Sequence, residues 1–305
     1  MDGLLGSLGG RLSQRLLSST VQALLFVGCA AAALSYGDGG HLVGRALGWV
    51  GRQDPLAQTL VVAAALGGSL VAGLAVDRLA RPVLRLLAGY WPGWLAPVRS
   101  RLVRRARDRA AADNRRVQRL LGDGDGGFEY QRLDRRLRDL PSTPDRYQPS
   151  RLGNIMCAAR TRPVDRYGID PVAVWPHLYL VVPDPARREL TTAGLAVDRA
   201  AAAFLWSLVF VALTPWAWWA APVGILAATL VARMALPAAA RTHGDLLEAA
   251  VDLYRLDLYE RLRWPLPECP ADERALGEQL VSYLVYGSDA RSPRFRPAAS
   301  GPQEP

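Results

Sequence analysis

The sequence contains no lysine and only three cysteines and three histidines, so residues typical of metal and nucleophile sites are scarce. Cys29, Cys157 and Cys269 lie far apart and form no Cys-x-x-Cys pair, so neither a disulfide framework nor a zinc site is indicated. The chain also lacks a Gly-x-Ser-x-Gly elbow, a P-loop, a His-Glu-x-x-His motif and a dinucleotide-binding fingerprint. We therefore expect no metal ion and no cofactor.

Because lysine is absent, arginine supplies every basic side chain apart from the histidines. The 37 arginines outnumber 28 acidic residues and give the chain a net charge of +9. A guanidinium group stays charged and binds phosphate in a fork, so anionic partners are favoured. This arginine-rich and alanine-rich composition is also typical of a GC-rich bacterial genome.

Hydrophobic residues make up 50% of the chain, and they are concentrated in blocks rather than spread at helical spacing. A helix needs about 20 apolar residues to cross a bilayer. The sequence therefore predicts an all-α integral membrane protein with four transmembrane helices in two hairpins. Proline cannot continue a helix, so Thr214-Pro215-Trp216 is the expected break in the second hairpin. Each helix of that hairpin is short for a full crossing. A re-entrant hairpin, which does not reach the far side of the membrane, is therefore the alternative. The four stretches are residues 16–37, 55–76, 200–215 and 216–236.

The distribution of arginine predicts the orientation of the chain. Residues 77–197 contain 23 arginines and 13 acidic residues, a net charge of +10, whereas the loop 37–55 has two of each. Positively charged loops stay in the cytoplasm, so we expect a protein of the bacterial cytoplasmic (inner) membrane with both termini cytosolic. The alternative for the first stretch is a cleavable signal, because Arg11 and Arg15 precede it.

These patterns predict six segments along the chain. Two transmembrane hairpins are separated by an arginine-rich helical cytosolic region and followed by amphipathic helices. The segments are 1–15, a cytosolic N-terminus; 16–76, the first hairpin; 77–198, the arginine-rich region; 199–236, the second hairpin; 237–287, the amphipathic C-terminal cytosolic helices; and 288–305, a disordered tail.

The C-terminal segment should pack against the arginine-rich region. From residue 237 onward there are 8 arginines and 11 acidic residues, a net charge of −3. An apolar stripe at helical spacing accompanies these acidic residues and should provide most of the contact. We therefore expect one all-helical cytosolic domain assembled from both segments. The stripe consists of Leu247, Val251, Tyr254, Leu258 and Leu262.

A helix predicted near residues 97–121 carries a cluster of arginines close to a predicted membrane helix. Such a cluster attracts anionic lipid headgroups, by about 1 kcal/mol for each charge near the surface. Nucleic acid is an unlikely partner because no aromatic platform is interleaved with the arginines. A helix that is merely solvated is the alternative. The cluster consists of Arg99, Arg101, Arg104, Arg105, Arg107 and Arg109.

Two polar blocks, near residues 151–176 and 243–264, have an unusually specific pattern. An Arg-Leu-Gly-Asn run precedes Arg-Tyr-Gly-Ile-Asp and Trp-Pro, and His-Gly-Asp precedes a second Trp-Pro. The chain resembles in these blocks an uncharacterised family of bacterial, especially actinobacterial, multi-pass membrane proteins, a resemblance that implies no known activity. The residues that carry it are Arg151, Gly153, Asn154, Arg166, Tyr167, Gly168, Asp170, Trp175, Pro176, His243, Asp245 and Trp264.

Considered without the resemblance, the blocks are either a docking surface or packing that fixes the helices against one another. Arg160, Arg162 and Arg166 are placed to pair with Asp165 or Asp170. Both interpretations are compatible with a folded helical domain.

We therefore predict a non-enzymatic multi-pass membrane protein whose cytosolic helices bind a protein partner or anionic lipid, in a scaffold or regulatory role. That partner could be a second copy of the chain, which makes a homo-oligomer. One alternative is an oligomeric channel or transporter. The other is a lipid-modifying enzyme at the membrane surface, for which His243, Asp245, Glu248 and Asp252 are the best available cluster.

Overall fold

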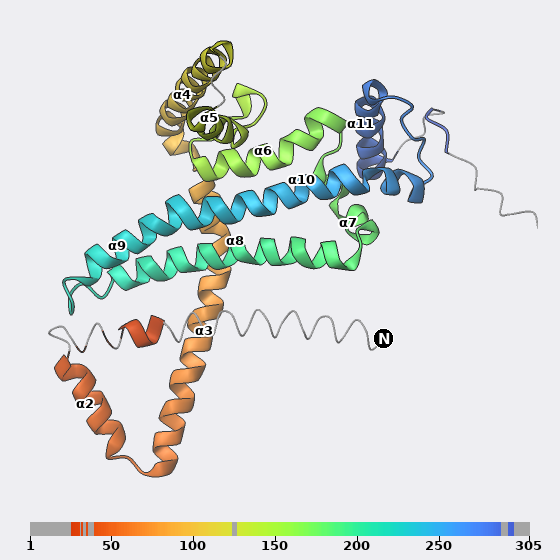
Figure 1. Ribbon diagram of the computed structural model, residues 1–305. Helices are drawn as coiled ribbons and strands as arrows, with labels where there is room; N and C mark the ends of the chain where they lie inside the picture. The colour runs from red at the N-terminus through yellow and green to blue at the C-terminus, as the bar shows by residue number, and fades with distance from the viewer. Residues whose placement is uncertain are drawn as a thin grey trace, which may run out of the picture. The chain divides into compact units, whose positions relative to one another are not determined.

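The computed structural model describes residues 26–30, 32, 35, 40–123, 127–287 and 292–295 (Figure 1). These residues form helices and connecting turns, and no strand is found among them. Three helical runs are long and apolar enough to cross a membrane: Pro55–Gly122, Asp184–Val211 and Ala220–Arg261. The predicted N-terminus 1–15, most of the predicted span 16–37 and most of the predicted tail 288–305 lie outside the described residues.

The chain divides into two compact units, each built from two stretches of sequence. The apolar unit comprises Met1–Arg85 and Asp198–Leu236, and the polar unit comprises Leu86–Val197 and Pro237–Pro305. Among the described residues, the apolar unit contains α2 (Gly40–Gly51), most of α3 (Pro55–Ala88), the second half of α8 (Asp184–Val211), α9 (Ala220–Leu230) and a π-helical turn, η3 (Val231–Ala235).

The described helices of the apolar unit expose large apolar side chains. Leu56, Leu60 and Val71 of α3 are 74%, 62% and 67% exposed. Soluble proteins rarely display contiguous apolar surface of this kind, whereas such surface suits hydrocarbon. The helix α3 is also longer than the predicted stretch 55–76, since it continues past Pro82 to Ala88.

The second apolar block contains the predicted break, but its helices do not begin and end where the sequence suggested. Helix α8 already begins at Asp184 and ends at Val211, and α9 begins only at Ala220. Residues 212–219 form consecutive turns, and the Thr214 hydroxyl donates to the Val211 carbonyl at 2.5 Å. A Cβ on Gly224 of α9 would meet the Val211 side chain at 2.6 Å, so α8 and α9 pack closely.

The polar unit gathers both charged segments of the sequence around one hydrophobic core. Buried Val174 and Leu178 meet Val251, Leu258 and Leu280 there. Of the predicted C-terminal stripe, all but Leu247 belong to this core or pack against it. Besides the first half of α8 and the last residues of α3, the described helices of the unit are α4 (Ala96–Gly122), α5 (Phe128–Arg138), α6 (Arg151–Tyr167), α7 (Pro171–Val181), α10 (Leu236–Arg261) and α11 (Pro270–Tyr286), with short η1 (Gly93–Leu95) and η2 (Pro144–Arg146).

The ends of α6 and α7 follow from local sequence. Ser150 caps α6 by accepting a hydrogen bond from the Gly153 amide at 3.0 Å, and Gly168 ends this helix in the left-handed conformation with φ of 68°. Asp170 then caps α7 by accepting from the Val172 amide at 2.9 Å. The capping residues thus set a short corner between two helices that share a core.

Helices α4 and α5 form a smaller pair within the polar unit. Val117 and Leu120 of α4 are buried against Leu133 of α5. Arg116 donates to Glu129 at 2.9 Å, and this hydrogen bond holds the pKa of the exposed Glu129 carboxyl below its ordinary value. The pair presents Arg105 and Arg109 of α4 next to the start of α6.

Helix α11 crosses the end of α6 at very short range (Figure 1). A Cβ added to Gly277 of α11 would overlap the backbone carbonyl of Tyr167, and one added to Gly168 would overlap that of Arg274. Backbone atoms cannot move aside as a flexible side chain can. Only glycine therefore fits at these two crossing points.

We expect Gly277→Ala to lower the free energy of unfolding of the purified protein by about 1–3 kcal/mol, the usual cost of overpacking. Gly122→Ala is the matched control, because a Cβ at Gly122 meets nothing within 4 Å. Chemical denaturation followed by tryptophan fluorescence compares the two variants. Equal stability of both variants would contradict the close crossing.

Candidate functional site

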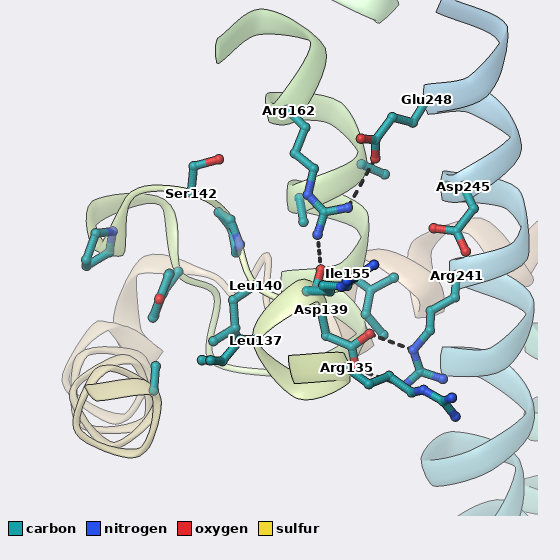
Figure 2. A pocket seen from close by; sticks show the side chains of 18 of the residues that line it. Arg135, Leu137, Asp139, Leu140, Ser142, Ile155, Arg162, Arg241, Asp245 and Glu248 are labelled. Atoms are coloured by element: carbon teal, nitrogen blue, oxygen red, sulfur yellow. Dashed lines mark hydrogen bonds and ion pairs between the residues drawn. The ribbon is translucent and has the colours of Figure 1, made fainter. Parts of the chain in front are cut away.

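A cavity with a volume of about 1460 Å³ lies in the polar unit, between the α4–α5 pair and helices α6 and α10 (Figure 2). Helix α10 presents Arg241, Asp245, Glu248 and Asp252 to it. These positions recur at intervals of three and four, so they share one helix face. Figure 2 shows Arg241, Asp245 and Glu248 reaching from α10 toward residues of α5 and α6.

Asp139, just after α5, is the central acidic residue of this cavity. Its side chain is only 7% exposed. It accepts two hydrogen bonds from Arg241, at 2.6 Å from Nε and 2.9 Å from Nη2, and further bonds from Arg151 at 3.1 and 3.2 Å. The carboxylate is thereby neutralised from two sides, which offsets the cost of its burial.

Glu248 forms a second ion-pair group on the same α10 face. It lies 3.1 Å from Arg162 Nη1 and 2.8 Å from Arg166 Nη1, and Arg166 also approaches Asp252 at 3.8 Å. Arg162 donates in addition to the Arg138 carbonyl. Both arginines belong to α6, so Glu248 ties α6 to α10.

The charged side chains of this larger cavity mainly form ion pairs that hold its helices together. Among its carboxylates, Asp139, Glu248 and Asp252 already interact with arginine, whereas Asp108 and Asp245 are exposed. No group of three or more histidine, cysteine or acidic residues that could hold a metal ion occurs among the residues the structure describes. The four residues considered for a lipid-modifying enzyme therefore do not form a ligand cluster there.

A second cavity, of about 400 Å³, lies on the other side of Asp139. Asp139 and Leu140 line both cavities. The smaller one is strongly basic, because arginines of α4, α5 and α6 line it. These are Arg105, Arg109, Arg136 and Arg151.

The structure divides the predicted arginine cluster of α4 into two groups. Arg107 is held by partners on the surface of the polar unit, since it donates to Asp145 at 3.1 Å and to the Pro144 carbonyl at 2.9 Å. The other five are exposed and have no ion pair among the described residues. These five are Arg99, Arg101, Arg104, Arg105 and Arg109.

The first residues of the polar block 151–176 fix the start of α6. Arg151 binds Asp139, and a Cβ at Gly153 would overlap the Ala88 carbonyl. The buried Asn154 side chain accepts from the Gln148 amide at 2.7 Å and donates to the Gln148 and Ser150 carbonyls, each at 3.0 Å. Each of these residues therefore has a packing or hydrogen-bonding role.

The middle of the block fixes the opposite end of α6. Arg166 binds Glu248, and the Tyr167 ring lies under the Arg255 guanidinium, 4.2 Å from its centroid. Burial is the largest influence on the Tyr167 hydroxyl and raises its pKa. Asp170 both caps α7 and binds Arg160 at 3.0 Å.

The two tryptophans of the polar blocks, Trp175 and Trp264, lie in or beside the core. Trp175 and Pro176 belong to α7, and Trp175 packs against the core beside Tyr179. Trp264 is buried and stacks on Tyr283 with centroids 5.3 Å apart. On α10, His243 lies half-buried opposite Gly194 of α8, and Asp245 lines the larger cavity.

Sequence reasoning missed Asp139, Arg241 and the partner of Arg162. Asp139 and Arg241 are 102 positions apart, and Arg162 and Glu248 are 86 apart, so local spacing carried no signal for either contact. The available hint was the excess of arginine in one segment and of acid in the other. That hint indicates which segments meet, but it does not indicate which residues pair.

The fold and composition define an α-helical protein with three candidate membrane-spanning helices and an arginine-rich helical unit. Comparisons with protein-family models, curated proteins and solved structures give no match. Evidence on function therefore comes from the residues described above.

We expect Asp139→Asn to reduce the free energy of unfolding by about 2–3 kcal/mol, because hydrogen bonds to charged groups contribute about 1.5–3 kcal/mol. Asp134→Asn is the matched control: Asp134 pairs with Arg138 at 2.9 Å on the surface, and we expect a loss below about 1 kcal/mol. Denaturant titration of both variants measures the difference. A control variant as unstable as Asp139→Asn would show that the buried position has no special role.

Proposed function

We propose that the protein is a non-enzymatic scaffold or regulatory protein of the bacterial inner membrane. In this proposal four spans form two hairpins, the polar unit faces the cytosol, and the exposed arginines of α4 bind anionic lipid headgroups. The observation that carries the proposal is the separation of the α4 arginines. Arg107 has an acidic partner within the chain, Asp145, whereas its five neighbours are exposed without an acidic partner in the described chain.

The exposed arginines have the chemistry required for headgroups. A guanidinium binds a phosphate group through two parallel hydrogen bonds, and it releases its hydration water more readily than an ammonium group does. Other arginines already have a carboxylate partner in the interior, since Asp139 and Glu273 are buried and each is bound by arginine. Exposed arginine on α4 therefore remains available for an external anion.

The chain also places α4 soon after a candidate membrane helix. Helix α3 ends at Ala88 and α4 begins at Ala96, so the connection spans at most about 30 Å. Tyr90 and Trp94 in this connection are 61% and 77% exposed. Exposed tyrosine and tryptophan are enriched at the level of lipid headgroups, which supports a membrane-surface position for the start of α4.

Lipid contact predicts a selective loss of bound anionic lipid. The full-length protein in phosphatidylcholine nanodiscs containing phosphatidylglycerol should retain phosphatidylglycerol, measured by native mass spectrometry. Changing Arg99, Arg101 and Arg104 to Gln should weaken retention about fivefold for each arginine, because each charge contributes about 1 kcal/mol near an anionic surface. Raising the salt concentration should weaken it further.

The control variant changes three exposed arginines elsewhere, Arg132, Arg261 and Arg294, to Gln. None of these residues has an ion pair in the part of the chain that the structure describes. Equal lipid retention by the two triple variants would contradict the proposal that the α4 arginines bind anionic headgroups. It would show that net charge, rather than the position of α4, governs the contact.

The natural cysteines test the proposed orientation. Cys269 is exposed, whereas Cys157 is half-buried, and burial raises the pKa of the Cys157 thiol because desolvation disfavours the thiolate. In a Cys29→Ser background, a membrane-impermeant maleimide should leave Cys269 unmodified in intact cells and modify it in opened membranes. Cys157 should react slowly near neutral pH and faster as the pH rises toward its elevated pKa. Modification of Cys269 in intact cells would place the polar unit outside.

A further inference from the structure

The smaller cavity differs from the larger one in how its arginines are neutralised. Of the six arginines that line the larger cavity, five have acidic partners at 3.1 Å or less, and Arg135 alone has no ion pair among the described residues. In the smaller cavity, Arg105, Arg109 and Arg136 have no ion pair among the described residues. The two cavities are neighbours, because Ala110, Asp139 and Leu140 line both of them.

Asp139 cannot neutralise these three arginines, because Arg151 and Arg241 already occupy its oxygens. Asp113 is the one other acidic residue that lines the smaller cavity, and it makes no ion pair in the described chain. Four arginines and two aspartates therefore line the site, which leaves it with a net positive charge of two.

These three arginines are exposed and line the cavity from two helices. Arg105 and Arg109 are one turn apart on the same face of α4, and Arg136 comes from the last turn of α5. The third side of the cavity is the beginning of α6, where Ser150 and Arg151 line it. Packing of Val117 and Leu120 against Leu133 holds the α4–α5 pair together, so the arginines belong to packed helices.

Convergent guanidinium groups repel one another unless an anion lies between them. A phosphate monoester provides up to two negative charges and several acceptor oxygens, and it matches the planar fork of arginine. A cavity of about 400 Å³ lies in the size range of small-molecule sites. A carboxylate ligand would satisfy fewer of the donors that three arginines present.

We propose that this cavity is an oxyanion site for a phosphate monoester, with Arg105, Arg109 and Arg136 as its ligands. The phosphate can belong to a lipid headgroup, as in phosphatidic acid, or to a soluble compound such as glycerol 3-phosphate. The site shares Arg105 and Arg109 with the membrane contact proposed above and so rests partly on it, but it adds Arg136 of α5 and does not use Arg99, Arg101 or Arg104.

The soluble arm of the test uses isothermal titration calorimetry. Full-length protein in phosphatidylcholine nanodiscs is titrated with glycerol 3-phosphate, and we expect saturable binding at one site per chain. Arg109→Gln and Arg136→Gln should each weaken binding at least tenfold. Arg132→Gln is the matched control on α5, because Arg132 is exposed and does not line the cavity, and its affinity should stay within twofold of the unmodified protein.

The lipid arm uses nanodiscs that contain phosphatidic acid, with retained lipid counted by native mass spectrometry. Loss of retention in Arg109→Gln and Arg136→Gln, but not in Arg132→Gln, supports a lipid source of the phosphate. Binding of glycerol 3-phosphate without retention of phosphatidic acid supports a soluble source of the phosphate. Near-ultraviolet circular dichroism confirms that each variant is folded.

The proposal is overturned if neither compound binds, or if both bind equally well to Arg109→Gln and Arg136→Gln. The triple change of Arg99, Arg101 and Arg104 separates this outcome from failure of the proposed membrane contact. If that triple variant retains phosphatidylglycerol normally while Arg109→Gln loses glycerol 3-phosphate, the cavity site stands and the membrane contact does not.

Discussion

The polar unit depends on the neutralisation of one buried carboxylate. Asp139 ends the α4–α5 pair, Arg151 begins α6, and Arg241 lies near the start of α10, so their ion pairs join three separate parts of the unit. A buried carboxylate without such partners is strongly unfavourable. Correct assembly of these three elements therefore depends on residues that are up to 102 positions apart in the chain.

Glycine is the second constraint on this assembly. Gly153 lies where a Cβ would overlap the Ala88 carbonyl, and Gly277 lies where a Cβ would overlap that of Tyr167. The two contacts fix the opposite ends of α6, one against the end of α3 and the other against α11. Between them, Arg162 and Arg166 bind Glu248 of α10. Helix α6 is therefore positioned by backbone contact at its ends and by charge along its length.

Helical spacing in the sequence predicted which face of the C-terminal helix is buried, whereas the pairing of distant residues was not predictable. The C-terminal stripe reached the core because helical spacing places Val251 and Leu258 on one face. Arg160 does pair with Asp170, as local spacing predicted, but Arg162 and Arg166 pair with Glu248 on another helix. Local spacing cannot distinguish an arginine that pairs with a residue nearby in the sequence from one that pairs with a residue on a distant helix.

The same limit applies to the membrane segments and the candidate site. Apolar composition is a local property, and it was sufficient to identify three helices long enough to cross a bilayer. The fourth span, its pairing into hairpins and the orientation stay predictions, because they depend on residues outside the described chain or on a membrane. The smaller cavity was not predictable at all, since Arg136 joins Arg105 and Arg109 only after α5 packs on α4.

The absence of lysine gives these arrangements a common physical basis. A guanidinium group has five donors, so Arg241 can bind both oxygens of Asp139 at once, which the point charge of an ammonium group does less well. Arginine therefore serves equally as an internal brace and as an external anion ligand. Whether a given arginine acts in one way or the other depends on the local supply of carboxylate. That supply is sufficient between α6 and α10, whereas five exposed arginines of α4 have no ion pair in the described chain, and both proposed anion contacts rest on this difference.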